Sequence, residues 1–207
     1  MYCMALTACC FCLFGSKAPH HEREDLGKGE KKLPVVCIPI GVDESIVRVA
    51  LGEVEISLPE TRCVIGSLER QIDLSKAFVK RRNQYLADAI LDSIPLPEDE
   101  SRVVGIVDVD IYTSTLNFVF GIAELPGRRA LISTYRLRMG DVSNELLIER
   151  LAKEIVHELG HTFGLRHCSD KRCVMHFSNS IADTDYKSVR LCERCFEAYR
   201  KAKLWFF

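Results

Sequence analysis

HELGHTFGLRH, residues 157–167, is the stretch of this chain that most constrains its fold and its chemistry. His157 and His161 stand four residues apart, so on a helix both imidazoles project from one face and can bind a single ion. Gly164 lets the backbone turn sharply out of the helix, which brings His167 round as a third ligand. Three protein ligands leave the fourth position of a tetrahedral zinc open, and an open position is typical of a catalytic site.

Glu158 adds a base to this site, because it follows the first histidine and is placed to accept a proton from a zinc-bound water. The short pattern His-Glu-x-x-His also recurs by chance on solvated helix faces, but the glycine and the third histidine are two further requirements. The pattern falls at the end of a helix expected over residues 143–163, with Ser143 as its N-cap. The apolar stripe of that helix consists of Leu147, Ile148, Leu151, Ile155, Leu159 and Phe163. The sequence therefore predicts a zinc hydrolase.

Residues downstream of the motif narrow this prediction to a family. The pattern of residues 157–167 resembles the signature of the metzincin clan of metallopeptidases, which continues into a Met-containing turn. Cys168, the run Cys173-Val174-Met175 and the run Cys192-Glu193-Arg194-Cys195 resemble one family of that clan, the archaemetzincins. The motifs cover about residues 157–195, and upstream only a segment such as 117–121 looks similar.

The resemblance implies a zinc-dependent metallopeptidase with two zinc ions per chain, one catalytic and one structural. In the archaemetzincins four cysteines bind the second zinc beside the catalytic one, and the matching residues here are Cys168, Cys173, Cys192 and Cys195. Met175 then forms an apolar floor under the catalytic metal, although a methionine at this place would otherwise be interpreted as ordinary core.

One departure from the clan leaves a role open. Some metzincins carry a tyrosine two positions after the methionine, whereas this chain has Phe177, which can neither ligate zinc nor donate a hydrogen bond. Tyr186 and His176 are candidates for an oxyanion helper, but their spacing does not show that either one acts so.

The ten cysteines are many for a protein of a reducing compartment. The four downstream of the motif would form a closed thiolate site over residues 168–203 that joins the C-terminal helix to the loop after the catalytic helix. Two disulfides are the alternative, but no convincing secretory signal precedes them, so thiolate ligation in the cytoplasm is the preferred interpretation. Cys37 and Cys63 lie in apolar runs and are interpreted as small buried hydrophobic residues. The remaining cysteines are Cys3, Cys9, Cys10 and Cys12.

The charge of the chain is nearly balanced, with 28 basic and 29 acidic side chains, so no global field favours nucleic acid or an anionic membrane. A nucleic-acid-binding zinc module is an alternative because basic residues gather near the C-terminus, namely Lys187, Arg190, Arg194, Arg200, Lys201 and Lys203. Glu193 and Glu197 interrupt that run, and a solvated helix face explains it more simply. We expect a monomer that acts on peptide or protein substrates and has no nucleic-acid partner.

The chain is expected to consist of an N-terminal extension and one domain. Residues 1–14 are apolar and Cys-rich, but they are too short to cross a membrane and lack the basic start of a signal peptide, so we expect no stable membrane insertion. Residues 17–32 are charged and typical of a flexible linker. The predicted division is an extension over residues 1–32 and a single metzincin-like catalytic domain over residues 33–207.

From residue 34 the pattern alternates strands with helices. The expected strands cover residues 35–40, 62–66, 103–111, 117–125 and 129–137, and the expected helices cover residues 43–55, 75–93, 143–163 and 185–203. The last two strands are joined at Pro126-Gly127, a dipeptide suited to a type II turn. This order predicts an α/β fold, with a mixed, mostly parallel twisted sheet, an antiparallel edge strand, and packed helices that include the zinc-binding one.

The metzincin resemblance gives the edge strand a function. In that clan an antiparallel edge strand lines the cleft and pairs with an extended substrate above the catalytic helix. By order along the chain the candidate is residues 117–125, with Phe118, Val119, Phe120 and Gly121 as substrate-binding residues. Such pairing uses main-chain hydrogen bonds and selects little of the substrate sequence. A plain edge strand is nearly as good an interpretation for any single residue there.

The expected reaction is hydrolysis of a peptide bond. Zinc held by three neutral imidazoles lowers the pKa of its water to about 7, and Glu158 would take that proton and deliver it to the departing amine. The alternative is a zinc-binding regulatory or interaction protein with little or no peptidase turnover. Glu158 favours catalysis, because a purely structural zinc site has no use for a base.

Overall fold

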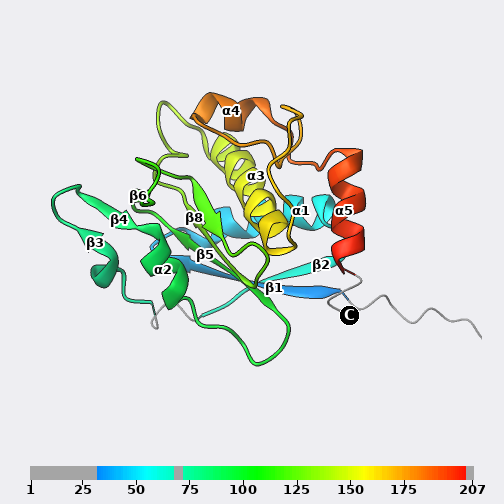
Figure 1. Cartoon of the computed structure of the whole chain (residues 1–207). Helices are drawn as coiled ribbons and strands as arrows, with labels where there is room; N and C mark the ends of the chain where they lie inside the picture. Colours follow the sequence, from blue (N-terminus) through cyan, green and yellow to red (C-terminus); the bar gives the residue numbers. More distant parts are fainter. Residues whose placement is uncertain (1–31, 68–71, 204–207) are drawn as a thin grey trace, which may run out of the picture. The chain divides into compact units, whose positions relative to one another are not determined.

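The computed structural model describes residues 32–67 and 72–203, with a five-stranded sheet of order β2-β1-β5-β8-β7 at its centre (Figure 1). The strands are β1 Leu33–Ile40, β2 Thr61–Ile65, β5 Arg102–Val107, β7 Gly121–Ala123 and β8 Arg129–Ser133. β1, β2, β5 and β8 run parallel, whereas β7 pairs antiparallel with β8 at the edge of the sheet. The predicted mixed, mostly parallel sheet with an antiparallel edge strand is confirmed.

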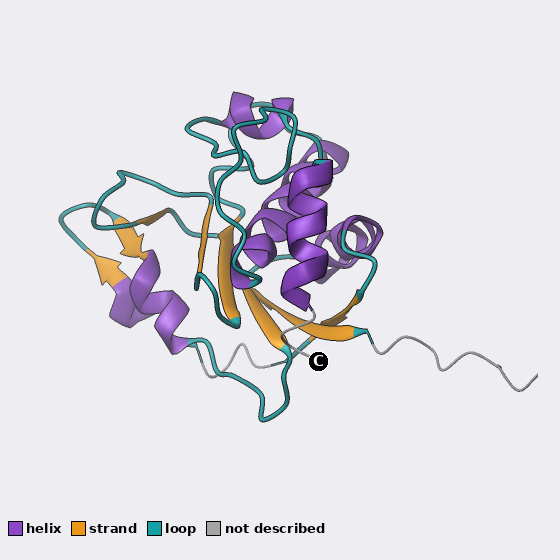
Figure 2. Cartoon of the chain, turned by 45° about the vertical axis from the view of Figure 1, so that its right-hand side comes forward, coloured by secondary structure: helices purple, strands orange, loops and turns teal. Residues whose placement is uncertain are grey.

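Helices cover both faces of this sheet (Figure 2). The helices on one face are α1 (Glu44–Ser57), α3 (Asn144–Thr162) and α5 (Glu193–Lys203), and α2 (Ala87–Ser93) lies on the other. Val104 of β5 packs into the core on the side of α1 and α3, and its neighbour Val103 packs into the core on the side of α2. Both are fully buried. A strand buried on both faces explains why β5 is a continuous apolar run in the sequence.

Helix α3 carries the first two histidines and lies where the sequence predicts. Ser143 is its N-cap, and the hydroxyl oxygen accepts a hydrogen bond from the amide of Leu146 at 3.3 Å. The apolar stripe faces the sheet, with Ile155 and Leu159 fully buried. After the helix, Gly164 has a φ of 85°, a left-handed conformation that favours glycine. The predicted sharp turn before the third histidine is therefore confirmed.

The helix predicted over residues 75–93 is wrong in its first half. Phe78 and Tyr85 stand seven residues apart, which suits a helix face, but they pair across two antiparallel strands with ring centroids 5.0 Å apart. The chain turns between them at Asn83, which has a φ of 53°. The observed elements are the 3-10 helix η2 (Leu74–Ala77), β3 (Phe78–Val79), β4 (Gln84–Leu86) and then α2.

The strand predicted over residues 103–111 is divided in two. β5 ends at Val107, and β6 (Ile111–Tyr112) joins the small sheet of order β3-β4-β6. The polar residues between them leave the main sheet, because Asp108 pairs with Arg138 at 3.5 Å and Asp110 pairs with Arg136 at 2.6 Å.

The two strands around Pro126-Gly127 are shorter than predicted, since β7 begins only at Gly121 and β8 ends at Ser133. The predicted type II turn is wrong. Such a turn requires a positive φ at its third residue, and Gly127 does not have one, while the peptide bond between Leu125 and Pro126 is cis.

The helix predicted over residues 185–203 begins later than expected, at Glu193. A separate short helix, α4 (Ile181–Tyr186), precedes it and starts with a capping box of Ser180 and Asp183. Between the two helices the main chain bonds to another loop instead, because the amide of Val174 donates to the carbonyl of Arg190 at 3.0 Å. The last helix therefore starts where the chain has reached the cysteine pair Cys192 and Cys195.

Two further predictions concern the ends of the chain. Within residues 32–67 and 72–203, none of the helices combines the length and the apolar character needed to cross a membrane. The extension over residues 1–32, with Cys3, Cys9, Cys10 and Cys12, lies outside the described residues apart from Lys32.

Candidate active site

Three histidines meet at the C-terminal end of α3. His157 and His161 are buried on the helix, and His167 is exposed on the loop after Gly164. The potential ligand nitrogens of the three lie within 4.8 Å of one another, and Nε2 of His157 is 3.1 Å from Nε2 of His161. The structure thus brings together the three residues that the motif predicts as ligands.

Backbone carbonyls orient the two helical imidazoles. Nδ1 of His157 lies 2.7 Å from the carbonyl oxygen of Val174, and Nδ1 of His161 lies 2.7 Å from that of Leu165. A carbonyl can only accept, so each Nδ1 carries the proton and each Nε2 offers its lone pair. Burial lowers the pKa of both histidines from the ordinary value of 6.5, which favours the neutral imidazole that a metal requires. This donor set fits a zinc ion.

Met175 is fully buried and packs against α3 at Gly160. A Cβ added to Gly160 would be 2.4 Å from Sδ of Met175, so the methionine packs directly on the helix backbone between the two ligands. This close approach of Met175 to the helix requires a residue without a side chain at position 160. Sequence reasoning missed this role of Gly160, although its place inside the motif was visible.

Glu158 points into the same site and is almost completely buried. Burial, reinforced by the negative charge of Glu154 and opposed by Lys187, raises the pKa of this carboxyl well above its usual range. Strand β7 lies close to the carboxylate, because a Cβ added to Gly121 would be 2.7 Å from Oε1 of Glu158. Such a carboxyl is suited to holding a proton during a reaction.

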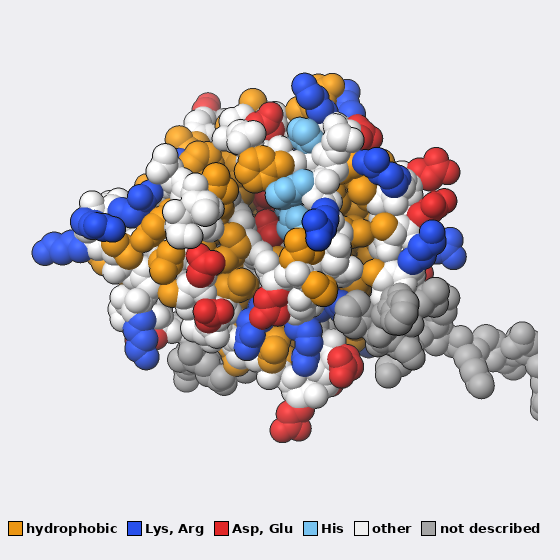
Figure 3. Space-filling view, in the orientation of Figure 1, with side chains coloured by type: hydrophobic (Ala, Val, Ile, Leu, Met, Phe, Trp, Pro, Cys, Tyr) orange, Lys and Arg blue, Asp and Glu red, His pale blue; other side chains and the backbone are white. Residues whose placement is uncertain are grey.

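A cleft of about 380 Å³ contains the histidines and Glu158. Figure 3 shows histidine side chains in a hollow of the surface, with acidic groups deeper inside and hydrophobic side chains around it. The predicted substrate-binding residues Phe118, Val119, Phe120 and Gly121 all line this cleft. Arg136 supports the first of them, since its guanidinium lies 4.2 Å from the ring centroid of Phe118.

The structure does not place either candidate for the oxyanion helper, His176 or Tyr186, in the lining of the cleft. Phe177 lines the cleft and its ring centroid is 4.9 Å from that of His167. Nδ1 of His176 contacts the carbonyl of Cys168 at 2.9 Å, and the exposed ring of Tyr186 lies under Arg172.

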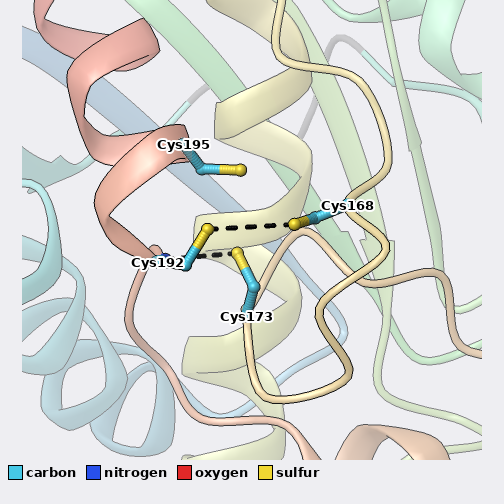
Figure 4. A group of neighbouring side chains, drawn as sticks. All are labelled: Cys168, Cys173, Cys192 and Cys195. Atoms are coloured by element: carbon cyan, nitrogen blue, oxygen red, sulfur yellow. Dashed lines mark hydrogen bonds between the residues drawn. The ribbon is translucent and has the colours of Figure 1, made fainter.

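Four cysteines gather beside the loop that follows α3 (Figure 4). They come from the loop after α3 and from the start of α5, and they are Cys168, Cys173, Cys192 and Cys195. Their sulfurs lie within 4.8 Å of one another, and Sγ of Cys168 is 3.8 Å from Sγ of Cys192. Tetrahedral ligands at a Zn–S distance of about 2.3 Å stand about 3.8 Å apart. None of the cysteines in the described part of the chain is in a disulfide.

Hydrogen bonds to sulfur surround this cluster. The amide of Cys192 donates to Sγ of Cys173 at 3.3 Å, and Nη2 of Arg194 and the amide of Asp170 donate to Sγ of Cys168 at 3.3 and 3.4 Å. Burial raises the pKa of Cys168, but the N–H donors of Asp170 and Arg194 and its neighbouring thiols lower it to about 7. Donors of this kind stabilise thiolates and support metal ligation.

Among the cleft residues that sequence reasoning missed are Glu154, Ser178 and Lys187. Glu154 stands four residues before Glu158 on α3, so the helix period could have found it. No spacing indicates Lys187, which the sequence places in a basic run typical of a solvated face. That interpretation is wrong for Lys187, because its side chain is completely buried and pairs with Glu154 at 3.0 Å.

The sequence model of peptidase family M54 matches residues 41–201. The chain belongs to this family. Among the curated relatives, the archaemetzincin of Methanopyrus kandleri is 49% identical over 126 residues, which cover 60% of this chain and 71% of the relative. The archaemetzincin of Pyrococcus furiosus is 47% identical over 139 residues, which cover 64% of this chain and 72% of the relative.

Solved structures agree with this assignment. The crystal structure of archaemetzincin from Methanopyrus kandleri matches with a TM-score of 0.76 and 37% identity, covering 86% of this chain and 99% of that one. Archaemetzincin from Archaeoglobus fulgidus complexed with malonate has a TM-score of 0.69 and 36% identity, covering 80% and 99%. A zinc-dependent peptidase from Methanocorpusculum labreanum has a TM-score of 0.70 and 25% identity, with the same coverage.

The predicted membership of the archaemetzincins is confirmed, and the chain is a zinc-dependent metallopeptidase of family M54. The alternative of a zinc-binding protein without peptidase turnover is not favoured.

Proposed function

We propose that this archaemetzincin binds two zinc ions per chain and hydrolyses peptide bonds at one of them. The catalytic ion would be held by His157, His161 and His167, and Glu158 would serve as the base. The observation that carries the proposal is the convergence of three oriented imidazoles and a buried carboxyl in one cleft.

Glu158 performs the proton transfers of this reaction. Zinc, when bound, acts as a Lewis acid that makes water a nucleophile near neutral pH. Glu158 orients the attacking water and accepts its proton, and the buried carboxyl then delivers that proton to the departing amine. The raised pKa of the carboxyl favours the intermediate stage, in which Glu158 holds the proton.

Strand β7 positions the substrate. It is the edge strand of the main sheet, so its outer main-chain groups have no strand partner among the described residues. An extended peptide can add to this edge through main-chain hydrogen bonds while its side chains contact Phe118, Val119 and Phe120 along the cleft.

The second zinc ion would be structural and held by the thiolates of Cys168, Cys173, Cys192 and Cys195. A closed site of this kind joins α5 to the loop that carries His167, so it contributes to folding. Thiolate ligation needs reduced cysteines, which favours a cytoplasmic protein. The three histidines and Glu158 come from one chain, which supports a monomer acting on peptides or proteins. The nearly balanced charge of the chain supports the absence of a nucleic-acid partner and of stable membrane insertion.

The test compares wild type with Glu158→Gln, both purified without chelator. Elemental analysis should find two zinc ions per chain in each protein, and mass spectrometry of a diverse peptide library should find cleavage by wild type. Loss of the base should reduce turnover by about 10²–10⁴-fold. Glu145→Gln, in the exposed first turn of α3, is the matched control and should keep both properties.

Each outcome bears on one part of the proposal. A single zinc ion per chain would contradict the two-site assignment. Undiminished cleavage by Glu158→Gln would contradict its role as base. A wild-type protein that carries two zinc ions and cleaves no peptide would favour the alternative of a zinc protein without turnover.

A further inference from the structure

The inner end of the cleft contains a buried ion pair that neither holds the catalytic zinc nor transfers a proton in the proposed hydrolysis. Nζ of Lys187 lies 3.0 Å from Oε1 of Glu154, and the two side chains are 0% and 3% exposed. Glu154 stands one helical turn before Glu158 on α3, and Lys187 comes from the segment after α4. Both line the cleft, whereas its outer lining includes the exposed Leu116 and Leu125.

Two buried polar atoms among the residues that line the cleft have unused hydrogen-bonding capacity. The contact between Lys187 and Glu154 lacks hydrogen-bond geometry, and no atom of the described residues accepts a hydrogen bond from Nζ. Oγ of Ser178, which also lines the cleft, is likewise buried without a hydrogen-bond partner in the described part of the chain. Buried polar groups nearly always have partners, so these two atoms point to a polar group supplied from the cleft.

A second lysine shows that burial alone does not leave donors unused. Lys153 lies next to Glu154 on α3 and, like Lys187, is almost completely buried. Its Nζ pairs with Glu149 at 2.7 Å and donates to the carbonyls of Thr184 and Asp185 at 3.2 Å each. Lys153 does not line the cleft. The unused donors therefore belong to the lysine that faces the substrate space.

The walls in front of this polar end are apolar, and they include Val119, Phe120, Ile122 and Phe177. A side chain that fills the space needs an apolar stem and a polar tip. We propose that the inner end of the cleft is a specificity pocket for a substrate side chain that ends in a neutral carboxamide, glutamine above all. Lys187 donates to the carbonyl oxygen of that carboxamide, and the hydroxyl of Ser178 supplies a second polar contact. This inference deepens the proposed peptidase function and rests on it.

The charges around the pocket favour a neutral tip over a charged one. Glu154 already balances Lys187, so a substrate carboxylate would compete with Glu154 for a single ammonium and add negative charge beside Glu158. A substrate ammonium would add a charge beside this balanced pair and would compete with Lys187 for Glu154. A carboxamide leaves the charge balance unchanged while accepting the unused hydrogen bonds.

The test measures selectivity among peptides that differ at one position. A positional-scanning library first identifies the position whose side chain enters the cleft. Peptides with glutamine, norleucine, glutamate or lysine at that position are then compared by kcat/KM with the full-length wild-type protein. One hydrogen bond from a buried ammonium should favour glutamine over norleucine by about tenfold to a hundredfold. Glutamate and lysine should be the poorer substrates.

Variants assign the preference to its residues. Lys187→Met should abolish the preference for glutamine over norleucine, and Ser178→Ala should weaken it by a smaller factor. Lys153→Met is the matched control and should keep the wild-type ratio. If Lys187→Met fails to fold because Glu154 is left unpaired, the double variant Glu154→Gln/Lys187→Met removes both charges and takes its place in the same comparison.

The result that overturns the inference differs from the one that overturns the proposed function. Equal or better cleavage of the norleucine or glutamate peptide by wild type, or an unchanged ratio in Lys187→Met, excludes the pocket while leaving the peptidase intact. If wild type cleaves no peptide, the peptidase proposal fails. The affinities of the same peptides, measured with a label, then decide whether the pocket selects glutamine. A tenfold tighter Kd for glutamine supports it, and equal affinities exclude it.

Discussion

Gly121→Ala tests whether the edge strand and the base of the reaction depend on a glycine at their contact. A Cβ at this position would lie 2.7 Å from Oε1 of Glu158 and 2.8 Å from the carbonyl oxygen of Leu131, and real Cβ contacts essentially never fall below 3.0 Å. Leu131 belongs to β8, which is held between β5 and β7, so its oxygen cannot retreat. Either the carboxylate of Glu158 or strand β7 must therefore move.

The structure sets the size of the expected effects. Forcing one extra methyl group into a packed contact costs about 1–3 kcal/mol of folding free energy. For a domain of this size that lowers the Tm by roughly 2–12 °C. A displacement of the base or of the substrate strand by up to about 1 Å costs about 10²-fold in kcat/KM. The three atoms nearest to the added methyl group belong to Glu158 and Leu131 and not to a histidine, so the zinc content should remain that of wild type.

The assay combines peptide cleavage, calorimetry and zinc analysis, with Gly52→Ala as the matched control. Gly52 is exposed on α1, and nothing lies within 4 Å of an added Cβ. The control should keep its activity and gain up to about 1 kcal/mol of stability, because alanine is the better helix former. Wild-type turnover together with a wild-type Tm in Gly121→Ala would show that the contact between β7 and Glu158 is not tight, and the reasoning would be refuted.

Two further predictions concern the cysteines. Cys192→Ser should lose one of two zinc ions, and its folding free energy should fall by at least about 2 kcal/mol of the roughly 10 kcal/mol that a structural zinc contributes. The control Cys63→Ser should keep both ions. An unchanged Tm and zinc content in Cys192→Ser would exclude a structural metal at the four cysteines. After chelation, iodoacetamide at pH 8 should label Cys168 well before Cys63, as peptide mapping by mass spectrometry can show. Burial raises the pKa of Cys63 to about 12. For Cys168 the N–H donors from Asp170 and Arg194 outweigh burial and lower its pKa to about 7, so of these two cysteines Cys168 alone is largely thiolate at pH 8. Equal labelling rates would contradict these environments.

Elements with a local cause were predictable, and those with a distant cause were not. Helix α3 has its N-cap, its apolar stripe and its terminating glycine within one stretch of sequence, and it lies where predicted. The helix expected over residues 75–93 failed because Phe78 and Tyr85 fit a helical period as well as a hairpin pair. The helix expected from residue 185 failed because residues 188 and 190 form main-chain hydrogen bonds with the loop at Arg172 and Val174 instead.

The candidate metal ligands could be predicted from the sequence itself. His157 and His161 are one helical turn apart, Gly164 makes the turn that brings in His167, and this geometry depends on local backbone conformation alone. The spacing of the cysteines likewise indicated a closed metal site, although their convergence needed the packing of α5 against the loop after α3.

The substrate side of the cleft was decided only by the tertiary structure. Lys187 meets Glu154 across 33 positions of sequence, and Gly121 meets Glu158 across 37, so neither contact follows from a helix or strand period. The tertiary structure also reversed the interpretation of Lys187. Its basic run is typical of a solvated helix face, but its side chain is a buried donor at the end of the cleft. Contacts of this kind arise because packed elements, rather than chain neighbours, supply the walls of a pocket.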